Sequence, residues 1–132
     1  MRTLIVEDDF TNRLVLQSYL TRFGECHVAG NGKEAVEEFR RSKQNGKTYD
    51  LICMDIMMPE MDGQEAVRQI RALEEAGGTF STSGVKIIMV TALDDIKNVF
   101  TAFKSLCDVY LFKPIDTEQL FAHLKSLDLI PK

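Results

Sequence analysis

Four short apolar runs divide the chain and predict buried strands. Hydrophobic residues follow one another in these runs with almost no polar interruption, which is typical of strands covered on both faces of a parallel sheet. The runs cover residues 3–6, 51–54, 85–90 and 109–112. A fifth segment, residues 26–29, is more polar and fits a strand at the edge of the sheet.

Stretches with the 3.6-residue period of an amphipathic helix separate these runs. Their apolar positions are Leu14, Leu16, Leu20 and Phe23; Ala35, Val36 and Phe39; Ala66, Val67, Ile70 and Leu73; Ile96, Val99, Phe100, Phe103 and Leu106; and Leu120, Leu124 and Leu127. Asn31 precedes Glu34, and Asp116 precedes Gln119, by the three residues of a capping box, which marks two helix starts. Strand and helix therefore alternate five times, and the predicted fold class is α/β.

The composition suits one soluble globular domain. The chain has 132 residues, 45% of them hydrophobic, and a formal net charge of −4 without a block of Lys or Arg. This balance argues against a surface that binds nucleic acid or anionic membranes non-specifically. The first apolar run has only four residues, too few for a signal-peptide core or a membrane span, so we expect a cytoplasmic protein. The three cysteines are unclustered, which favours reduced thiols over a disulfide or a zinc site.

Residues able to handle a phosphoryl group follow the four apolar runs. Glu7 and Asp8 follow the first run, Asp55 the second, Thr91 the third and Lys113 the fourth. Because parallel strands connected by right-handed crossovers place their carboxyl ends at one edge of the sheet, these residues are expected to share one crevice. Like charges about 4 Å apart repel by about 4 kcal/mol per pair at an effective dielectric constant near 20. The acids therefore predict a bound divalent cation, for which Mg²⁺ is the natural candidate.

The chemistry of each residue suggests a role. A carboxylate at Asp55 can attack phosphorus and hold it as an acyl phosphate. An ammonium at Lys113 can pair with a phosphoryl oxygen as a point charge, and the Thr91 hydroxyl can donate to the same oxygens. For Asp9 we favour the N-cap of a helix near Thr11, because three adjacent acidic side chains cannot all point into one site. The Lys113–Pro114 bond is compatible with either a cis or a trans peptide.

Together these motifs resemble the receiver domain of two-component response regulators, over residues 2 to about 129. The segments that carry the resemblance are Leu4-Ile5-Val6-Glu7-Asp8, Asp55-Ile56-Met57-Met58-Pro59 with Met61-Asp62-Gly63, Val90-Thr91-Ala92, and Phe112-Lys113-Pro114. The resemblance implies a three-layer flavodoxin-like (βα)5 fold, with a five-stranded parallel sheet of strand order 2-1-3-4-5. Because the chain stops soon after the fifth helical stretch, we expect residues 1–132 to form a single receiver domain without an output domain.

The resemblance also implies a site. Asp55 would accept a phosphoryl group from a sensor histidine kinase or a histidine phosphotransfer protein, Glu7 and Asp8 would bind Mg²⁺ with Asp55, and the Met57 carbonyl would complete the metal site. Thr91 and Lys113 would bind the phosphoryl oxygens, with Thr91 and Tyr110 as the switch pair. As a plain core aromatic, Tyr110 would look no different in the sequence.

The output would be the binding of a downstream effector protein, with no direct contact to nucleic acid or membrane, or transfer of the phosphate. The surface expected to change is formed by the fourth helix, the last strand and the fifth helix. Its exposed residues would include Lys97, Asn98, Lys104, Tyr110 and His123. We expect a monomer, or a dimer promoted by phosphorylation. The protein would catalyse its own phosphorylation and dephosphorylation without being a turnover enzyme.

Met57 and Leu93 predict slow loss of the phosphate. Many relatives carry polar side chains at these two positions, and those side chains help to position the hydrolytic water. Apolar residues there leave the water without such a partner. The decay of radiolabelled phosphoprotein in Mg²⁺ buffer measures this lifetime, and rapid decay would contradict the prediction.

Three other readings of the sequence are possible. A haloacid-dehalogenase-like phosphatase usually carries a second Asp two residues after the nucleophile, where this chain has Met57, so sustained turnover is not expected. A flavodoxin-like electron carrier shares the architecture, but the acids at 7–9 would repel the FMN phosphate, and colourless purified protein would exclude it. A receiver that is never phosphorylated is disfavoured because the acid pair, Asp55, Thr91 and Lys113 are all present.

Overall fold

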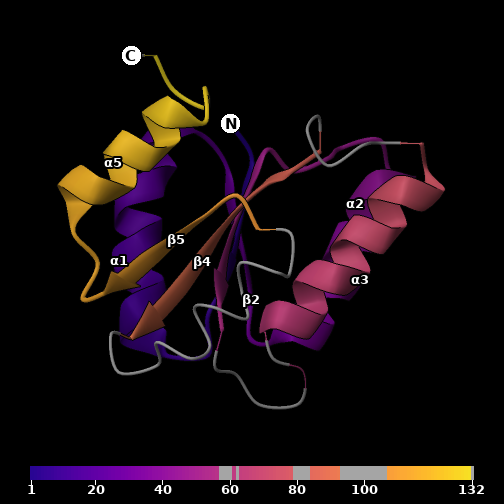
Figure 1. The fold of residues 1–132 in the computed structure, drawn as a ribbon, viewed down its shortest axis with the longest axis horizontal. Helices are drawn as coiled ribbons and strands as arrows, with labels where there is room; N and C mark the ends of the chain where they lie inside the picture. The colour runs from indigo at the N-terminus through magenta and orange to yellow at the C-terminus, as the bar shows by residue number, and fades with distance from the viewer. Residues whose placement is uncertain (57–60, 62, 79–83, 93–106, 132) are drawn as a thin grey trace.

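The computed structural model describes residues 1–56, 61, 63–78, 84–92 and 107–131. Five parallel strands form one sheet in the order β2-β1-β3-β4-β5, as the resemblance predicted (Figure 1). The strands are β1 (Thr3–Val6), β2 (Cys26–Ala29), β3 (Leu51–Asp55), β4 (Lys86–Ala92) and β5 (Val109–Lys113). The weak polar segment at 26–29 is the edge strand β2, which confirms its predicted place.

Helices cover both faces of the sheet. They are α1 (Phe10–Leu20), followed by the short 3-10 helix η1 (Thr21–Phe23), α2 (Gly32–Gln44), α3 (Gly63–Ala76) and α5 (Thr117–Ser126). Helices α1 and α5 lie on one face, and α2 and α3 lie on the other (Figure 1). The helix expected around residues 96–106 falls outside the described residues. No helix in the described part of the chain is long and apolar enough to cross a membrane.

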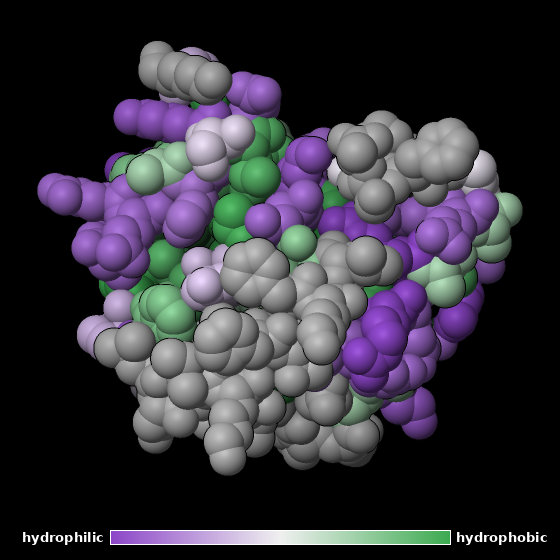
Figure 2. All heavy atoms as spheres, in the orientation of Figure 1, coloured by the Kyte–Doolittle hydropathy of each residue, from purple (hydrophilic) through white to green (hydrophobic). Residues whose placement is uncertain are grey.

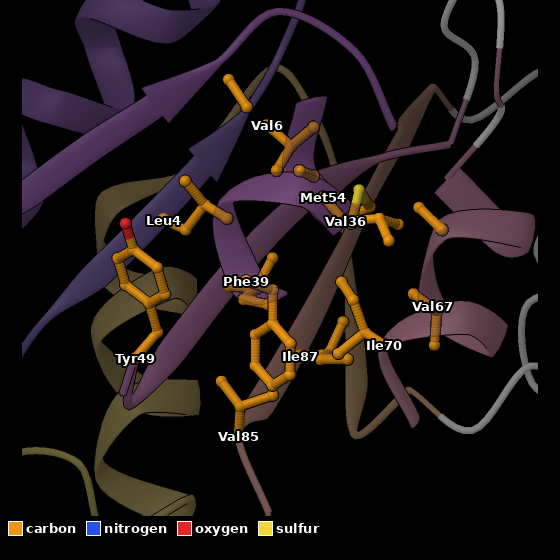
Figure 3. Close-up of a cluster of buried hydrophobic side chains, with 14 of the residues drawn as sticks. Leu4, Val6, Val36, Phe39, Tyr49, Met54, Val67, Ile70, Val85 and Ile87 are labelled. Atoms are coloured by element: carbon orange, nitrogen blue, oxygen red, sulfur yellow. The ribbon is translucent and has the colours of Figure 1, made fainter. Parts of the chain in front are cut away.

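The continuous apolar character of the strands follows from this layering. Side chains alternate between the faces of a strand, so in β1 Leu4 and Val6 belong to the cluster under α2 and α3, while Ile5 belongs to the cluster under α1 and α5. Figure 3 shows the first cluster, in which Phe39 of α2 and Ile70 of α3 meet over the sheet. Because both faces are buried, both sets of positions are mainly apolar.

The helix starts agree with the predicted caps in part. The Asp9 carboxylate accepts a hydrogen bond from the Asn12 N–H at 2.9 Å, so Asp9 is the predicted N-cap, and α1 begins at Phe10. Asn31 likewise caps α2 by accepting from the Glu34 N–H at 2.9 Å.

Two details of the predicted helix starts are wrong. The Glu34 carboxylate returns to the N–H of Gly30 and not to that of the cap, and Asp116 accepts from the Glu118 N–H and not from that of Gln119. An N-cap can accept a hydrogen bond from either the second or the third N–H of its helix, and the local backbone decides which.

One predicted apolar position is not buried. Leu14, counted among the helical apolar positions, is 48% exposed.

The three cysteines are free thiols, in agreement with the sequence. Cys53 lies in the middle of β3, is completely buried, and its burial raises the pKa of the thiol to about 12. A thiol with such a pKa remains protonated and unreactive at neutral pH.

Candidate functional site

Three carboxylates meet at the edge of the sheet where the strands have their carboxyl ends. Val6 pairs with Met54 across β1 and β3, so the next residues, Glu7 and Asp55, come side by side. Oxygens of Glu7, Asp8 and Asp55 all lie within 4.8 Å of one another, close enough to share one cation. Glu7 and Asp55 are buried, with 1% and 5% of their surface exposed, while Asp8 is exposed to solvent.

The Glu7 carboxylate lacks the hydrogen bonds that a buried acid normally has. Both of its oxygens are inaccessible; Oε2 has no hydrogen-bond partner among the described residues, and Oε1 is met by the ammonium of Lys113. Within the described part of the chain its charge is balanced by the Lys113 ammonium, whose Nζ lies 2.9 Å from Glu7 Oε1. Hard oxygen ligands with unsatisfied lone pairs fit a hard cation such as Mg²⁺.

Lys113 lies between two of the acids. Its Nζ also donates a hydrogen bond to Asp55 Oδ2 at 3.4 Å, so one ammonium contacts both buried carboxylates. Burial would lower the pKa of Lys113, but the contacts with Glu7 and Asp55 outweigh burial and raise that pKa above its ordinary value. Lys113 is therefore a permanent cation at neutral pH. The Lys113–Pro114 peptide that follows is cis, which resolves the alternative left open by the sequence.

The predicted switch residues lie on β4, which neighbours β3, and on β5, the edge strand next to β4. Thr91 belongs to β4, is 1% exposed, and stands one residue beyond Val90, which pairs with Asp55. Tyr110 of β5 is partly buried, and its ring contacts that of Phe112 edge-on, with centroids 5.3 Å apart. Tyr110 and His123 of α5 border a hollow of about 340 Å³. Met57, predicted to supply a metal ligand, lies outside the described residues.

Comparison with known proteins identifies this arrangement. The family described as response regulator receiver domain matches residues 3–125. The chain belongs to this family. The receiver domain is 34% identical over 125 residues to a probable transcriptional regulator ycf27 of Cyanidium caldarium, covering 94% of this chain and 45% of that protein. The chain thus spans less than half the length of this relative.

Solved structures show the same fold. The receiver domain of Ssk1, co-crystallised with the histidine phosphotransfer protein Ypd1 of Saccharomyces cerevisiae, matches with a TM-score of 0.82 and 32% identity, covering 96% of this chain and 88% of that one. The receiver domain of the sensor histidine kinase PA1611 of Pseudomonas aeruginosa PAO1 matches with a TM-score of 0.78 and 28% identity, covering 96% and 95%. That structure holds a magnesium ion in its active-site cleft.

The structure brings together most of the residues singled out in the sequence of this receiver domain. Glu7, Asp8, Asp55 and Lys113 lie in one cluster at the sheet edge, and Thr91 stands on β4, the strand beside β3. Asp55, Thr91 and Lys113 lie within strands and not in the loops after them, because β3, β4 and β5 extend beyond the apolar runs. The main chain of these three residues is thus positioned by pairing with the neighbouring strands of the sheet.

Sequence reasoning missed the structural role of Gly63 and a buried charge network on α3. The Gly63 N–H donates to the Ile56 carbonyl at 2.9 Å, which brings the first turn of α3 against the end of β3. Arg71 and Glu74 stand on the apolar side of α3 and are 3% and 4% exposed. The sequence did contain a sign of this network: two charged residues have the helical spacing of the apolar, buried positions of α3.

Proposed function

We propose that this receiver domain accepts a phosphoryl group on Asp55 from the phosphohistidine of a histidine kinase or a histidine phosphotransfer protein. The observation that supports this most is the position of the Asp55 carboxylate, buried at a strand end beside the acid Glu7 and in contact with the cation Lys113. A carboxylate with only a structural role would not need two further acids beside it, since their repulsion is costly.

The reaction is a phosphoryl transfer between two side chains. An Asp55 carboxylate oxygen forms a bond to phosphorus while the bond between phosphorus and the donor imidazole nitrogen breaks, and the electron pair of that bond stays on the imidazole. The product is an acyl phosphate. The Lys113 ammonium, 3.4 Å from Asp55 Oδ2, is placed to pair with a phosphoryl oxygen, and the Thr91 hydroxyl is the candidate donor from β4.

Glu7, Asp8 and Asp55 are the residues that would hold Mg²⁺. When bound, the ion would neutralise the negative charge that gathers as phosphoryl oxygens approach the acids. The solved PA1611 receiver domain, with magnesium in its cleft, supports this assignment. Glu7 contributes a carboxylate whose Oε2 has no hydrogen-bond partner in the described residues, while its Oε1 faces the Lys113 ammonium.

An apolar patch beside the acids supports a protein as the phosphoryl donor. Phe10 and Leu14, one turn apart on α1, are 63% and 48% exposed, and Phe10 follows Asp8 by only two residues. Exposed large apolar side chains next to a charged pocket are typical of a protein-binding surface. The solved complex of the Ssk1 receiver domain with Ypd1 is a precedent for such a partner.

The output surface proposed here includes β5 and α5. Tyr110, Phe112, Gln119, Ala122 and His123 line a shallow hollow between these elements. Hydrophobic atoms reach the surface beside α5 in Figure 2, whereas the surface over α2 and α3 is mainly hydrophilic. A phosphoryl group that draws Thr91 and Lys113 toward Asp55 would change the surroundings of Tyr110 on the same strand as Lys113, and so the binding of an effector protein. The predicted residues Lys97, Asn98 and Lys104 lie outside the described part of the chain.

The direct test is mass spectrometry of the receiver domain after incubation with acetyl phosphate and Mg²⁺. The wild type is expected to gain the mass of one phosphoryl group. The Asp55→Ala variant is expected to gain none, because among the described acids Lys113 contacts Asp55 and the enclosed Glu7, while Asp8 is exposed to solvent. Asp9→Asn, which keeps a side chain able to cap α1, serves as the matched control and is expected to behave like the wild type. A phosphoryl adduct on Asp55→Ala would refute the assignment.

A further inference from the structure

A buried ion network lies at the amino edge of the sheet, the edge opposite the acidic pocket. Arg71 Nη1 donates to Glu74 Oε1 and to the Val85 carbonyl, both at 2.7 Å. The other Glu74 oxygen accepts the Val85 N–H at 2.7 Å. These bonds fasten the end of α3 to the start of β4.

Asp108 extends this network to β5. Its Oδ2 accepts from Arg71 Nη2 at 3.0 Å and from the Ile87 N–H of β4 at 2.7 Å. The Asp108 N–H in turn donates to the Ile87 carbonyl at 2.9 Å. Asp108, directly before β5, thus contacts the same β4 residue through its main chain and its side chain, and Arg71 holds its carboxylate in place.

The rest of β5 does little to specify its own register. It is an edge strand, and of its five residues only Leu111 is fully buried. A strand slips readily when few buried side chains distinguish one register from the next. In the observed register Leu111 pairs with Val90, and Lys113 pairs with Ala92. A slip of one residue would turn Lys113 toward the other face and move it by about 3.3 Å along the sheet.

We propose that Asp108, held by Arg71, is a positioning residue for Lys113: it fixes the register of β5 so that the ammonium reaches Asp55 and Glu7. The two residues are about 16 Å apart along the strand, so Asp108 acts only through the strand. Buried ionic groups contribute little net stability, and setting a register is their best-attested use. This inference rests on the proposed function, because it assigns Lys113 to phosphoryl transfer.

Asp108→Ala is the variant that tests the proposal. It cuts the link to β5 and leaves Arg71 with Glu74 and the Val85 carbonyl, so the buried cation stays partnered. Glu65→Ala is the matched control. It removes an acid that pairs with Arg68 on the exposed side of α3, the helix that carries Arg71. The measurements are the phosphorylation rate with acetyl phosphate, Mg²⁺ affinity by calorimetric titration with MgCl₂, and backbone NMR contacts between β4 and β5.

The expected loss in phosphorylation rate for Asp108→Ala is about tenfold or more, since small misplacements of a reacting group are costly. The double variant Asp108→Ala/Lys113→Ala should be no slower than Lys113→Ala alone, because both changes remove the same ammonium from the site. Mg²⁺ affinity should be no weaker than in the wild type, since the acids stand on β1 and β3. Main-chain contacts between Ala92 and Lys113 should weaken, while Glu65→Ala matches the wild type in every measurement.

The proposal is overturned if Asp108→Ala keeps the wild-type phosphorylation rate, or if the double variant loses the product of the two single-variant losses. It is also overturned if Mg²⁺ affinity falls, because that result indicates that the whole site, and not only β5, has lost its structure. Should Asp108→Ala fail to fold, Asp108→Asn keeps an oxygen for the Ile87 N–H while removing the ion pair, and the same criteria apply to it. If the wild type itself takes up no phosphoryl group, the proposed function fails. The NMR contacts then still decide whether Asp108 sets the register.

Discussion

Replacing Gly63 by alanine is expected to destabilise the receiver domain by about 2–3 kcal/mol and to slow phosphorylation of Asp55. A Cβ at position 63 would lie 2.2 Å from the Asp55 carbonyl oxygen and 3.0 Å from the Ile56 Cα. Both atoms are backbone, so neither can rotate away, and α3 must shift. The shift would strain the hydrogen bond from the Gly63 N–H to the Ile56 carbonyl and move the phosphoacceptor. Urea denaturation and the phosphorylation rate measure the two effects.

The matched control is Gly30→Ala. The Cβ of this variant would meet Glu34 Oε2 at 3.2 Å, the far end of a side chain that can move by a few tenths of an ångström. We expect its free energy of unfolding to change by less than about 1 kcal/mol. Equal stability of Gly63→Ala and Gly30→Ala would show that α3 does not pack too closely against Asp55 and Ile56 to admit a Cβ at position 63.

The strands were predictable because burial on both faces leaves a simple pattern, whereas their order in the sheet followed from the resemblance to the receiver family. Residues 4–6 of β1 are apolar and buried, and a run of this kind ending in an acid has few other interpretations. Once the strands are parallel, topology brings Glu7, Asp55 and Lys113 to one edge whatever the loops between them do. The site could therefore be assembled from strand ends alone.

The contacts that the sequence did not reveal depend on neighbours distant in the chain. Arg71 and Glu74 interrupt the apolar stripe of α3, but their partners at Val85 and Asp108 become known only when β4 and β5 are in place. Leu14 has the helical spacing of a core residue, yet α1 turns it outward. Periodicity shows that a helix has an apolar face and does not show which residues at the margin of that face are covered.

The burial of Glu7 was also beyond the sequence. An acid after a strand is more often solvated, and only the fold shows that both of its oxygens are enclosed, with the Lys113 ammonium beside Oε1 and no partner for Oε2 among the described residues. A carboxylate kept in such surroundings costs stability and is retained at functional sites. This cost has a measurable consequence.

Changing Glu7 to glutamine is expected to abolish most Mg²⁺ binding and to leave the metal-free fold at least as stable as the wild type. The amide removes a buried charge that faces Asp55, while Lys113 keeps Asp55 as its partner at 3.4 Å. In the presence of Mg²⁺ the wild type should instead be the more stable of the two proteins. The wild type gains about 2.7 kcal/mol when the ion is present at a hundred times its Kd, and a variant that does not bind the ion gains nothing.

Thermal or urea denaturation in EDTA and in MgCl₂ measures both halves of this prediction. Asp9→Asn is again the control, since Asp9 caps α1 through the Asn12 N–H and the substituted amide can accept the same bond, so its gain in MgCl₂ should equal that of the wild type. A Glu7→Gln protein that gains as much stability from MgCl₂ as the wild type would remove Glu7 from the metal site. In that case the enclosed carboxylate of Glu7 would serve Lys113 alone, and the ion would have to be held by Asp8 and Asp55.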